Sequence, residues 1–382
     1  MSDAPITHID PSAFAADPYP ILAKMRIHAP ITHVPELGAT LITRRDDIHR
    51  EEKRTHVFSS SQPGGLMTVL MGENMMRKDG ADHMAERRAL FPALSPRAVA
   101  EHWQPMFETA AQAILADLAP KGRCDLVTDY AMPVSAAALI AITGLSEMSY
   151  AEMDRVSQHM IDGCANYGGD PAIEARCHAA TALIDAHIDR MLDKAPPRSA
   201  LAVQQEAGLP LQSIRANIKL VISGGQNEPR DAIAGTVFAL LQHTENLTRV
   251  HAGHNSWQDA FSEYVRWISP IGMSPRLVAQ ADTVADVRFE KGDRVFLMFS
   301  SAGRDETYFE NPDRYDITRD TGPAIPFGAG PHFCAGAAAS RALITQVALP
   351  LLFDALPGLA LDGPVPFQGW AFRGPTSVPV TW

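Results

Sequence analysis

Cys334 lies in a segment whose residue types would suit close contact with a large, flat metal cofactor. The segment reads Phe-Gly-Ala-Gly-Pro-His-Phe-Cys-Ala-Gly over residues 327–336. Its glycines permit positive φ angles and let the backbone approach a ligand closely. An alanine-rich helical pattern follows over residues 335–349, and a helix that begins at the cysteine would favour a thiolate there. Cys334 is therefore a candidate metal ligand.

A second candidate for chemistry is Glu228, in the run Gly-Gly-Gln-Asn-Glu-Pro over residues 224–229. This run interrupts the longest helical pattern of the chain, over residues 212–243. Glycine permits a helix to bulge, and Pro229 removes a backbone N–H donor and so opens the helix further. Burial there would raise the pKa of Glu228 and let it act as a general acid near neutral pH.

Two charged pairs have helical spacing. Glu263 and Arg266 are three residues apart, and His83 and Arg87 are four apart, so each pair shares one face of an expected helix. Taken alone, such pairs are typical of solvated surface charges. Their positions along the chain relative to Cys334 are the reason to consider a role for them beyond the surface.

Bulk composition excludes several classes of function. The formal net charge of −11 disfavours nucleic-acid binding, which needs basic surface. Four cysteines do not make a disulfide framework, and Cys124, Cys164 and Cys177 lack metal-binding spacing. The N-terminal residues show no signal peptide, and no run approaches the roughly 20 apolar residues that span a bilayer. We therefore expect a soluble, cytoplasmic protein that binds neither membrane nor nucleic acid.

The periodicity of apolar residues predicts a mainly α chain with minor β, in a single domain over residues 1–382. No linker, repeat or low-complexity block divides it. A hairpin is expected around Gly38, and a loop with one short helix over residues 59–79. The expected helices cover residues 18–28, 45–54, 81–89, 133–142, 149–163, 172–192, 212–243 and 257–267, and short strands are expected around residues 276–279, 288–289, 295–298 and 367–382.

The spacing F-G-x-G-x-H-x-C-x-G resembles the haem-binding loop of the cytochromes P-450. That resemblance implies the cytochrome P-450 fold, haem b (iron protoporphyrin IX) as cofactor, and Cys334 as the thiolate ligand of the iron. Thiolate ligation makes haem iron electron-rich and favours cleavage of the O–O bond. The function implied is a monooxygenase that inserts one oxygen atom from O2 into a small hydrophobic or aromatic substrate.

The resemblance extends to other positions of this family. It implies that the haem propionates meet His83, Arg87, Arg276 and His332, and that Phe327 and Gly328 contact the haem. It also implies a buried ion triad of Glu263 and Arg266 with Arg314, from the segment Asn-Pro-Asp-Arg-Tyr-Asp over residues 311–316.

The chain departs from this family in its oxygen-activating segment, which usually reads A/G-G-x-D/E-T. Asn227 stands where the acid is expected and Glu228 where the threonine is expected. The resemblance therefore assigns proton delivery to Glu228 beside Asn227. The alternative is that Glu228 pairs with Arg230 or another cation and leaves proton delivery to water.

The Gly-Gly break and the tail over residues 369–377 are similar to bacterial members of the family that O-demethylate aromatic ethers such as guaiacol. This similarity assigns Phe372 to the substrate ring. We expect the substrate pocket to draw also on Gly224, Gly225, Ile271, Met273 and the loop over residues 59–79. Electrons would come from a separate NAD(P)H-dependent reductase, with or without an iron–sulfur ferredoxin. Three alternatives stay open: a peroxygenase with Glu228 as acid and base, a hydroxylase of another small hydrophobic substrate, and a non-catalytic haem sensor.

Overall fold

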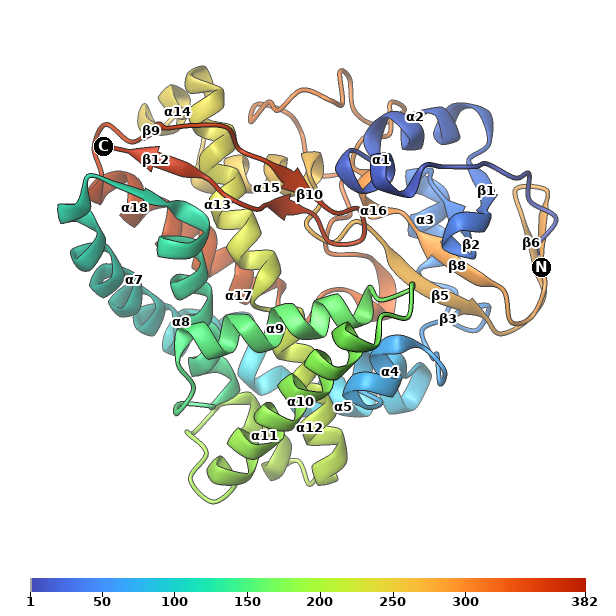
Figure 1. Cartoon of the computed structure of the whole chain (residues 1–382), viewed down its shortest axis with the longest axis horizontal. Helices are drawn as coiled ribbons and strands as arrows, with labels where there is room; N and C mark the ends of the chain where they lie inside the picture. Colours follow the sequence, from blue (N-terminus) through green and yellow to red (C-terminus); the bar gives the residue numbers. More distant parts are fainter. Residues whose placement is uncertain (1) are drawn as a thin grey trace. The chain divides into compact units, whose positions relative to one another are not determined.

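A computed structural model describes residues 2–382, and the chain divides into two compact units that interleave along the sequence. The sheet unit comprises residues 2–62, 238–334 and 365–376. The helical unit comprises residues 63–237, 335–364 and 377–382. The boundary falls inside helix α13 (Asn227–Gln242). Most elements are helices, and the prediction of a mainly α fold with minor β is confirmed (Figure 1).

The sheet unit is built on a five-stranded sheet in the order β1-β2-β8-β5-β3. Strands β1 and β2 form the predicted hairpin, with Ile31 opposite Ile42, and Gly38 lies in its turn at a φ of 57°. β2 then pairs in parallel with β8, and β5 pairs antiparallel with β8 and β3. The strands are β1 (Ile31–Val34), β2 (Ala39–Ile42), β3 (Phe58–Ser59), β5 (Ser274–Val278) and β8 (Arg294–Leu297).

Burial of both faces of the central strands holds this sheet in place. All four residues of β2 are buried, and Ala39, Leu41 and Ile42 join a core with Phe58, Phe296 and Leu297. A strand that is apolar on both faces is covered on both faces. The remaining elements of the unit are α1 (Pro11–Ala16), α2 (Tyr19–His28), η1 (Pro35–Leu37), α3 (Arg45–Glu51), α14 (Thr244–His251), α15 (Trp257–Trp267), α16 (Phe299–Ala302), η6 (Gly330–His332), β6 (Asp282–Val284), β7 (Val287–Phe289), β10 (Phe367–Gln368) and β11 (Gly374–Pro375).

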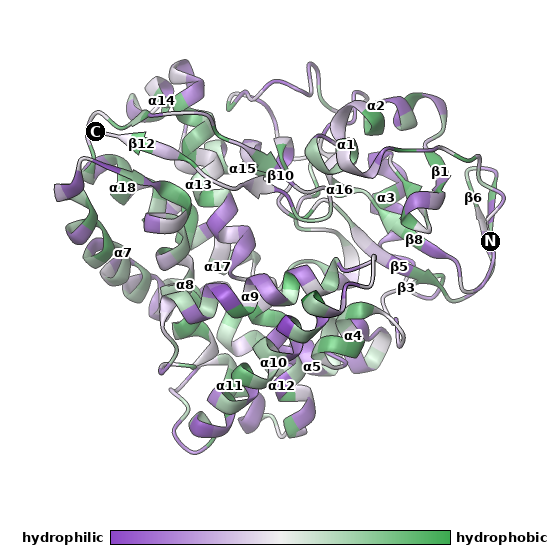
Figure 2. Cartoon of the chain, viewed as in Figure 1, coloured by the Kyte–Doolittle hydropathy of each residue, from purple (hydrophilic) through white to green (hydrophobic). Residues whose placement is uncertain are grey.

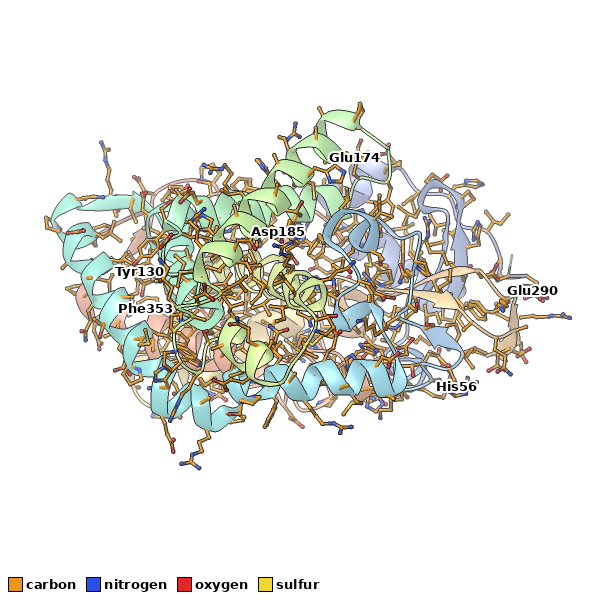
Figure 3. The ribbon with its side chains drawn as sticks, turned by 90° about the horizontal axis from the view of Figure 1, so that it is seen from below. His56, Tyr130, Glu174, Asp185, Glu290 and Phe353 are labelled. Atoms are coloured by element: carbon orange, nitrogen blue, oxygen red, sulfur yellow. The ribbon has the colours of Figure 1, made fainter. Side chains whose placement is uncertain are left out.

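The helical unit packs amphipathic helices around a few buried ones. Helix α8 is apolar over most of its length and largely buried, whereas α9 carries apolar and polar faces, as the alternating colours along it show (Figure 2). The hydroxyl of Tyr130, labelled in Figure 3, donates a hydrogen bond to the carbonyl of Ala348 at 2.7 Å. This bond ties the segment before α8 to the helical run that follows the cysteine loop.

The helices of this unit, with its short 3-10 and π segments, run through most of the middle of the chain. They are α4 (Leu66–Met71), η2 (Met75–Arg77), α5 (Gly80–Leu94), α6 (Pro96–Ala98), η3 (Val99–Trp103), α7 (Gln104–Leu118), η4 (Ala119–Lys121), η5 (Val127–Ala131), α8 (Met132–Thr143), α9 (Tyr150–Cys164), α10 (Pro171–Met191), α11 (Ala200–Glu206), α12 (Leu211–Ser223), α17 (Ala337–Arg341), η7 (Ala342–Ala348) and α18 (Leu349–Ala355). A small sheet in the order β4-β12-β9 joins Arg123–Asp125, Pro379–Thr381 and Ala360–Leu361.

Among residues 2–382, no helix combines the length and apolar character needed to cross a membrane.

Candidate active site

The cysteine loop folds back on itself through backbone hydrogen bonds. The N–H of Gly328 donates to the carbonyl of Ile325 at 2.9 Å, and the N–H of Cys334 donates to the carbonyl of Phe327 at 2.9 Å. Gly328 and Gly330 have φ angles of 74° and 68°, which residues with a Cβ rarely adopt. The two glycines therefore turn the chain so that Phe327 and Cys334 face one another across the loop.

The helix after the loop begins later than predicted. Its first regular residue is Ala337, behind Gly336, rather than the cysteine itself. The backbone at residue 334 is still engaged in the loop through its bond to Phe327, so it is not part of the helix. Backbone positions in the loop, more than a helix N-terminus at the cysteine, therefore set the surroundings of the sulfur.

The four cysteines differ in their surroundings. Burial raises the pKa of Cys124 and of Cys164 to about 12, and the pKa of Cys177 to about 11. These three side chains are therefore neutral thiols at physiological pH and poor ligands. Cys334 is half-buried and lies in the glycine loop. Across residues 2–382, no group of three or more His, Cys, Asp or Glu side chains gathers to hold a bare metal ion.

Arg276 lies in β5, close to the cysteine loop within the sheet unit. Its side chain is 2% exposed, and it donates to Glu52 Oε1 at 3.2 Å and to the carbonyl of Pro275 at 3.1 Å. The other Glu52 oxygen accepts the N–H of Ala329 in the cysteine loop. Sequence reasoning missed Glu52, which is more than two hundred residues from both of its partners. His332, in the loop itself, is half-buried.

His83 and Arg87 lie one turn apart on α5 in the helical unit, as predicted. His83 is 2% exposed, and its Nδ1 is 2.8 Å from the carbonyl oxygen of Met75. A carbonyl oxygen only accepts, so Nδ1 carries the proton. The second ring nitrogen could then donate a bond to an anion only in the imidazolium form.

The long helical pattern is two helices, α12 and α13, separated by Gly224, Gly225 and Gln226. A Cβ at position 225 would come within 2.5 Å of the carbonyl oxygen of Val221 and 3.0 Å of Leu139 on α8, so only glycine fits. Pro229 lies in the first turn of α13, where its missing N–H costs no helical bond. The chain therefore breaks before Asn227, and the second helix begins at Asn227 with Pro229 in its first turn.

Asn227 is held tightly by α9. Its Oδ1 accepts from Ser157 Oγ at 2.7 Å, its Nδ2 donates to Gln158 Oε1 at 2.8 Å, and the side chain is 5% exposed. Both ends of the amide are therefore engaged. These contacts fix the first residue of α13 on α9.

Glu228 has the opposite environment. Both of its carboxyl oxygens are buried, and neither has a hydrogen-bond partner among residues 2–382. Burial raises its pKa to about 8, with a smaller upward effect of Asp231. Its own backbone N–H, which does not reach hydrogen-bond geometry, and Arg230 lower the pKa by less. The predicted rise in pKa is therefore confirmed. At neutral pH this carboxyl is mostly protonated.

Arg230 does not pair with Glu228. Its Nε contacts Asp231 at 2.9 Å and its NH1 contacts Asp154 on α9 at 3.0 Å. Gln226 also donates to Asp154, at 3.2 Å. The guanidinium is thus engaged by two other carboxylates, which argues against the alternative in which Glu228 is neutralised by Arg230.

The ion triad forms, but with a different third member. Helix α15 begins with a capping box in which Ser256 and Asp259 bond each other's backbone N–H. One turn on, Arg266 meets Glu263 with bonds of 2.6 and 2.7 Å, and both side chains are 0% exposed. The third member is Arg319, whose Nε lies 3.2 Å from Glu263 Oε1.

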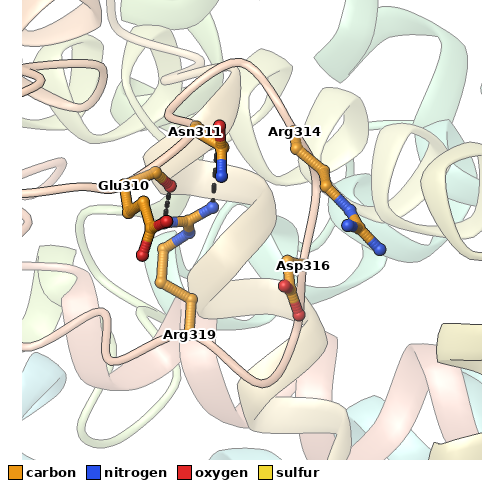
Figure 4. A pocket seen from close by; sticks show the side chains of 5 residues that line it. All are labelled: Glu310, Asn311, Arg314, Asp316 and Arg319. Carbon is orange, nitrogen blue, oxygen red and sulfur yellow. Dashed lines mark hydrogen bonds between the residues drawn. The ribbon is translucent and has the colours of Figure 1, made fainter.

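The prediction that Arg314 completes the triad is wrong. Arg314 is exposed, and only its backbone carbonyl takes part, as an acceptor from Arg266. Figure 4 shows its side chain directed away from Arg319, while Arg319 reaches the carbonyls of Glu310 and Asn311. The chain turns at Asn311, with a φ of 47°, and again before Arg319, so the second arginine of this loop returns to α15.

Two predicted substrate residues lie side by side in the sheet unit. Ile271 and Phe372 form an isolated antiparallel bridge, and the N–H of Gly272 donates to the carbonyl of Ala371 at 2.8 Å. A Cβ at position 272 would come within 2.0 Å of the carbonyl oxygen of Trp370, so the approach requires glycine. Met273 is 7% exposed and packs in the core of the sheet.

Comparisons with known proteins place the chain in a family. Residues 257–348 match the family model described as Cytochrome P-450. Cytochrome P-450 107B1 of Saccharopolyspora erythraea is 27% identical over 96% of both chains. The vitamin D(3) 25-hydroxylase of Pseudonocardia autotrophica is 27% identical over 96% of this chain and 94% of its own. The chain belongs to the cytochrome P-450 family.

Solved structures agree on the fold of this cytochrome P-450. One neighbour, crystallised with an acyl carrier protein ligated to hexadec-9Z-enoic acid, has a TM-score of 0.88. It covers 98% of this chain and 100% of its own at 23% sequence identity, so it bears on the fold alone. The enzyme is an oxidoreductase of the monooxygenase class, like its named relatives.

The cofactor of this family is haem b, and the residues of this chain suit it. The cysteine loop offers one half-buried sulfur beside two glycines at positive φ. Arg276 is a buried cation in the same unit, and His83 is a buried imidazole with one nitrogen already fixed. A flat porphyrin with two propionates calls for one sulfur ligand, close backbone approach and a cationic donor, and the cysteine loop and Arg276 offer these within the sheet unit.

Proposed function

We propose that this cytochrome P-450 O-demethylates small aromatic methyl ethers, with Cys334 as the iron ligand and Glu228 as the proton donor. Haem b supplies the activation of O2 when bound. Overall, an aryl methyl ether, O2, two electrons and two protons give a phenol, formaldehyde and water. One oxygen atom enters a methyl C–H bond, and the resulting hemiacetal breaks at its C–O bond to release the phenol.

The observation that carries the proton role is the buried Glu228 carboxyl without a hydrogen-bond partner. A protonated acid with a pKa of about 8 has a proton to donate at neutral pH and is easily reprotonated. Asn227 has no titratable proton, and its contacts with Ser157 and Gln158 favour a positioning role in place of the catalytic one predicted. It holds α13 so that the next residue keeps its place.

The cofactor roles follow the family positions. Cys334 would bind the iron, and Phe327 and Gly328 would lie against the haem. Arg276, His332, His83 and Arg87 would donate to the propionates. Burial of Arg276 supports this proposal, because a buried guanidinium is kept where anions meet it.

The aromatic substrate is supported by the tail. Gly369, with a φ of 90°, turns the chain so tightly that a Cβ there would meet the carbonyl of Phe372. The bridge to Ile271 then fixes the backbone of Phe372, whose half-buried ring packs against the hydrophobic core of the sheet unit. Rigid aromatic side chains contribute large contact area with little loss of conformational freedom. Gly224, Gly225 and Met273 complete the proposed substrate site.

Bacterial members of the family take electrons from separate redox partners. We propose that this chain likewise takes its electrons from an NAD(P)H-dependent reductase, acting directly or through an iron–sulfur ferredoxin.

The substrate class is tested by titrating the ferric enzyme with methoxybenzenes and methoxyphenols, with terpenes and fatty acids as controls. The proposal predicts a low- to high-spin shift with the aromatic ethers, and equal amounts of phenol and formaldehyde in turnover. Phe372→Leu should weaken binding of the aromatic ethers, whereas Phe367→Leu, whose ring packs 5.4 Å from Phe238, should not. A spin shift with aliphatic compounds only would overturn O-demethylation and leave the monooxygenase class intact.

The proton role is tested by measuring product formed per NAD(P)H consumed. Glu228→Gln should lower this ratio, because the amide cannot donate an acidic proton. Asp231→Asn is the matched control, an acid one turn further along α13 that is bound to Arg230. An unchanged ratio in Glu228→Gln would remove Glu228 from proton delivery.

A peroxide-driven reaction is the second candidate, because the same unpartnered carboxyl could serve as acid and base toward hydrogen peroxide. Turnover at low peroxide that exceeds the reductase-supported rate, and that is lost in Glu228→Gln, would favour it.

A further inference from the structure

Glu52, at the C-terminal end of α3, joins two parts of the sheet unit that bear on the cofactor. Its side chain is 2% exposed. Oε1 accepts from Arg276 NH2 at 3.2 Å, and Oε2 accepts from the backbone N–H of Ala329 in the cysteine loop. Each oxygen accepts from a donor. Burial raises the pKa of Glu52, and the Arg276 guanidinium and the N–H of Ala329 oppose that rise by favouring the carboxylate form.

The cysteine loop is shaped around this end of α3. A Cβ at Gly328 would lie 3.1 and 3.3 Å from the two carboxylate oxygens of Glu52. A Cβ at Gly330 would lie 2.9 Å from the Lys53 side chain and 3.2 Å from its Cα. Both positions have positive φ as well. The two glycines that turn the loop therefore also let it seat on residues 52 and 53.

We propose that Glu52 is a positioning residue for haem binding, which holds the cysteine loop and the Arg276 guanidinium in register through one buried carboxylate. This rests on the proposal that Cys334 and Arg276 meet the haem. The chain contacts that carry it are independent of the substrate. Loss of the carboxylate removes the acceptor that the Arg276 guanidinium and the N–H of Ala329 share.

Glutamine is the informative replacement because it keeps the length and shape of the side chain. Its single carbonyl oxygen can accept from Ala329 or from Arg276. Its NH2 group then faces the other donor, which is left unsatisfied. Glu52→Gln should therefore loosen either the loop or the arginine without opening a cavity.

Glu51 provides a matched control on the same helix. It is 0% exposed, and it accepts from Arg50 at 2.7 Å and from Arg54 at 2.8 Å. Neither of these partners belongs to the cysteine loop. Glu51→Gln thus removes a buried, arginine-bound carboxylate one residue away from Glu52.

The experiment measures transfer of haem from the loaded protein to excess apomyoglobin, followed by absorbance. Glu52→Gln should release haem about ten- to a hundredfold faster than the unaltered protein, the range expected for losing a hydrogen bond to a charged group. Glu51→Gln should stay within about threefold, as changes away from the site usually do. Circular dichroism of each variant checks that the fold is retained.

Equal haem release from Glu52→Gln and Glu51→Gln would overturn the proposal, whether both are fast or both are slow. If Glu52→Gln does not fold, Glu52→Asp takes its place, since the shorter side chain cannot reach both donors, and the same comparison applies. The carbon monoxide spectrum of the unaltered protein reports separately on the sulfur ligand. A failure of the Cys334 assignment is therefore distinguishable from a failure of the Glu52 role.

Discussion

Two buried glutamates of this chain have opposite surroundings. Glu263, in the sheet unit, accepts two bonds from Arg266, one from Arg319 and one from the N–H of Asp316 at 2.9 Å. Glu228, in the helical unit, has no hydrogen-bond partner for either oxygen among residues 2–382. Burial of a carboxylate is costly unless cations and donors compensate it, and otherwise the group takes up a proton. Glu263 is therefore a carboxylate compensated by cations and donors, whereas Glu228 is mostly protonated at neutral pH.

The largest effect on stability is expected from removing a cation that compensates the buried Glu263 carboxylate. Arg266→Ala leaves Glu263 buried with one guanidinium fewer and removes the bonds to the carbonyls of Gly303 and Pro312. We expect a loss of about 3–5 kcal/mol in the free energy of unfolding, typical of a buried ion pair that loses one partner. Urea denaturation of the loaded protein measures it. A loss below about 1 kcal/mol, the level of an exposed pair, would show that the triad is not the buried cluster described.

The corrected third member of the triad gives the next largest effect. Arg319→Ala should cost about 1.5–3 kcal/mol, the range for hydrogen bonds to charged groups. Arg314→Ala is the matched control, on the same loop but exposed, and should change stability by less than about 0.5 kcal/mol. The same denaturation experiment compares them. A larger loss for Arg314→Ala would restore the original prediction.

The uncompensated glutamate should show itself in the pH dependence of stability. The pKa of Glu228 is about 8 in the folded protein against an ordinary value of 4.5, so between these values the folded state holds more of this proton than the unfolded state does. Stability from this group is therefore fully present below pH 4.5 and falls as pH rises toward 8, by at most about 1.4 kcal/mol per pH unit.

The measurement is the difference in unfolding free energy between the unaltered protein and Glu228→Gln across that pH range, which removes the contribution of other titrating groups. The unaltered protein should lose stability relative to the variant as pH rises. A difference that stays flat would mean that Glu228 titrates near its ordinary value, and the contrast with Glu263 would be lost.

A smaller effect is expected at Asn227. Asn227→Ala removes two side-chain hydrogen bonds to α9 and should cost about 1–2 kcal/mol of stability. If Asn227 positions Glu228, Asn227→Ala should also lower the product formed per NAD(P)H consumed. Ser157→Ala, which removes one of the two bonds, should lower it too. If both variants formed as much product per NAD(P)H as the unaltered protein, Asn227 would have a structural role only.

Local patterns were enough to predict the hairpin around Gly38, the break before Asn227 and the turn at the cysteine loop. Glycine, proline and alternating apolar residues determine those features through nearby backbone geometry. The choice between Arg314 and Arg319 could not be made in this way, because both follow Asn311 and the turns of the loop decide which returns to α15. Glu52 was also beyond reach, because its partners at positions 276 and 329 are brought to it only by the folded chain.

The most direct test of the whole account is the carbon monoxide spectrum of the reduced, haem-loaded protein. If the sulfur of Cys334 binds the iron, the Soret band should move to the long wavelength that thiolate ligation gives. Cys334→Ala should lose that band, while Cys177→Ala, which alters a buried neutral thiol, should keep it. Absence of the band from the unaltered protein, or its persistence in Cys334→Ala, would contradict the assignment of this loop as the haem-thiolate site.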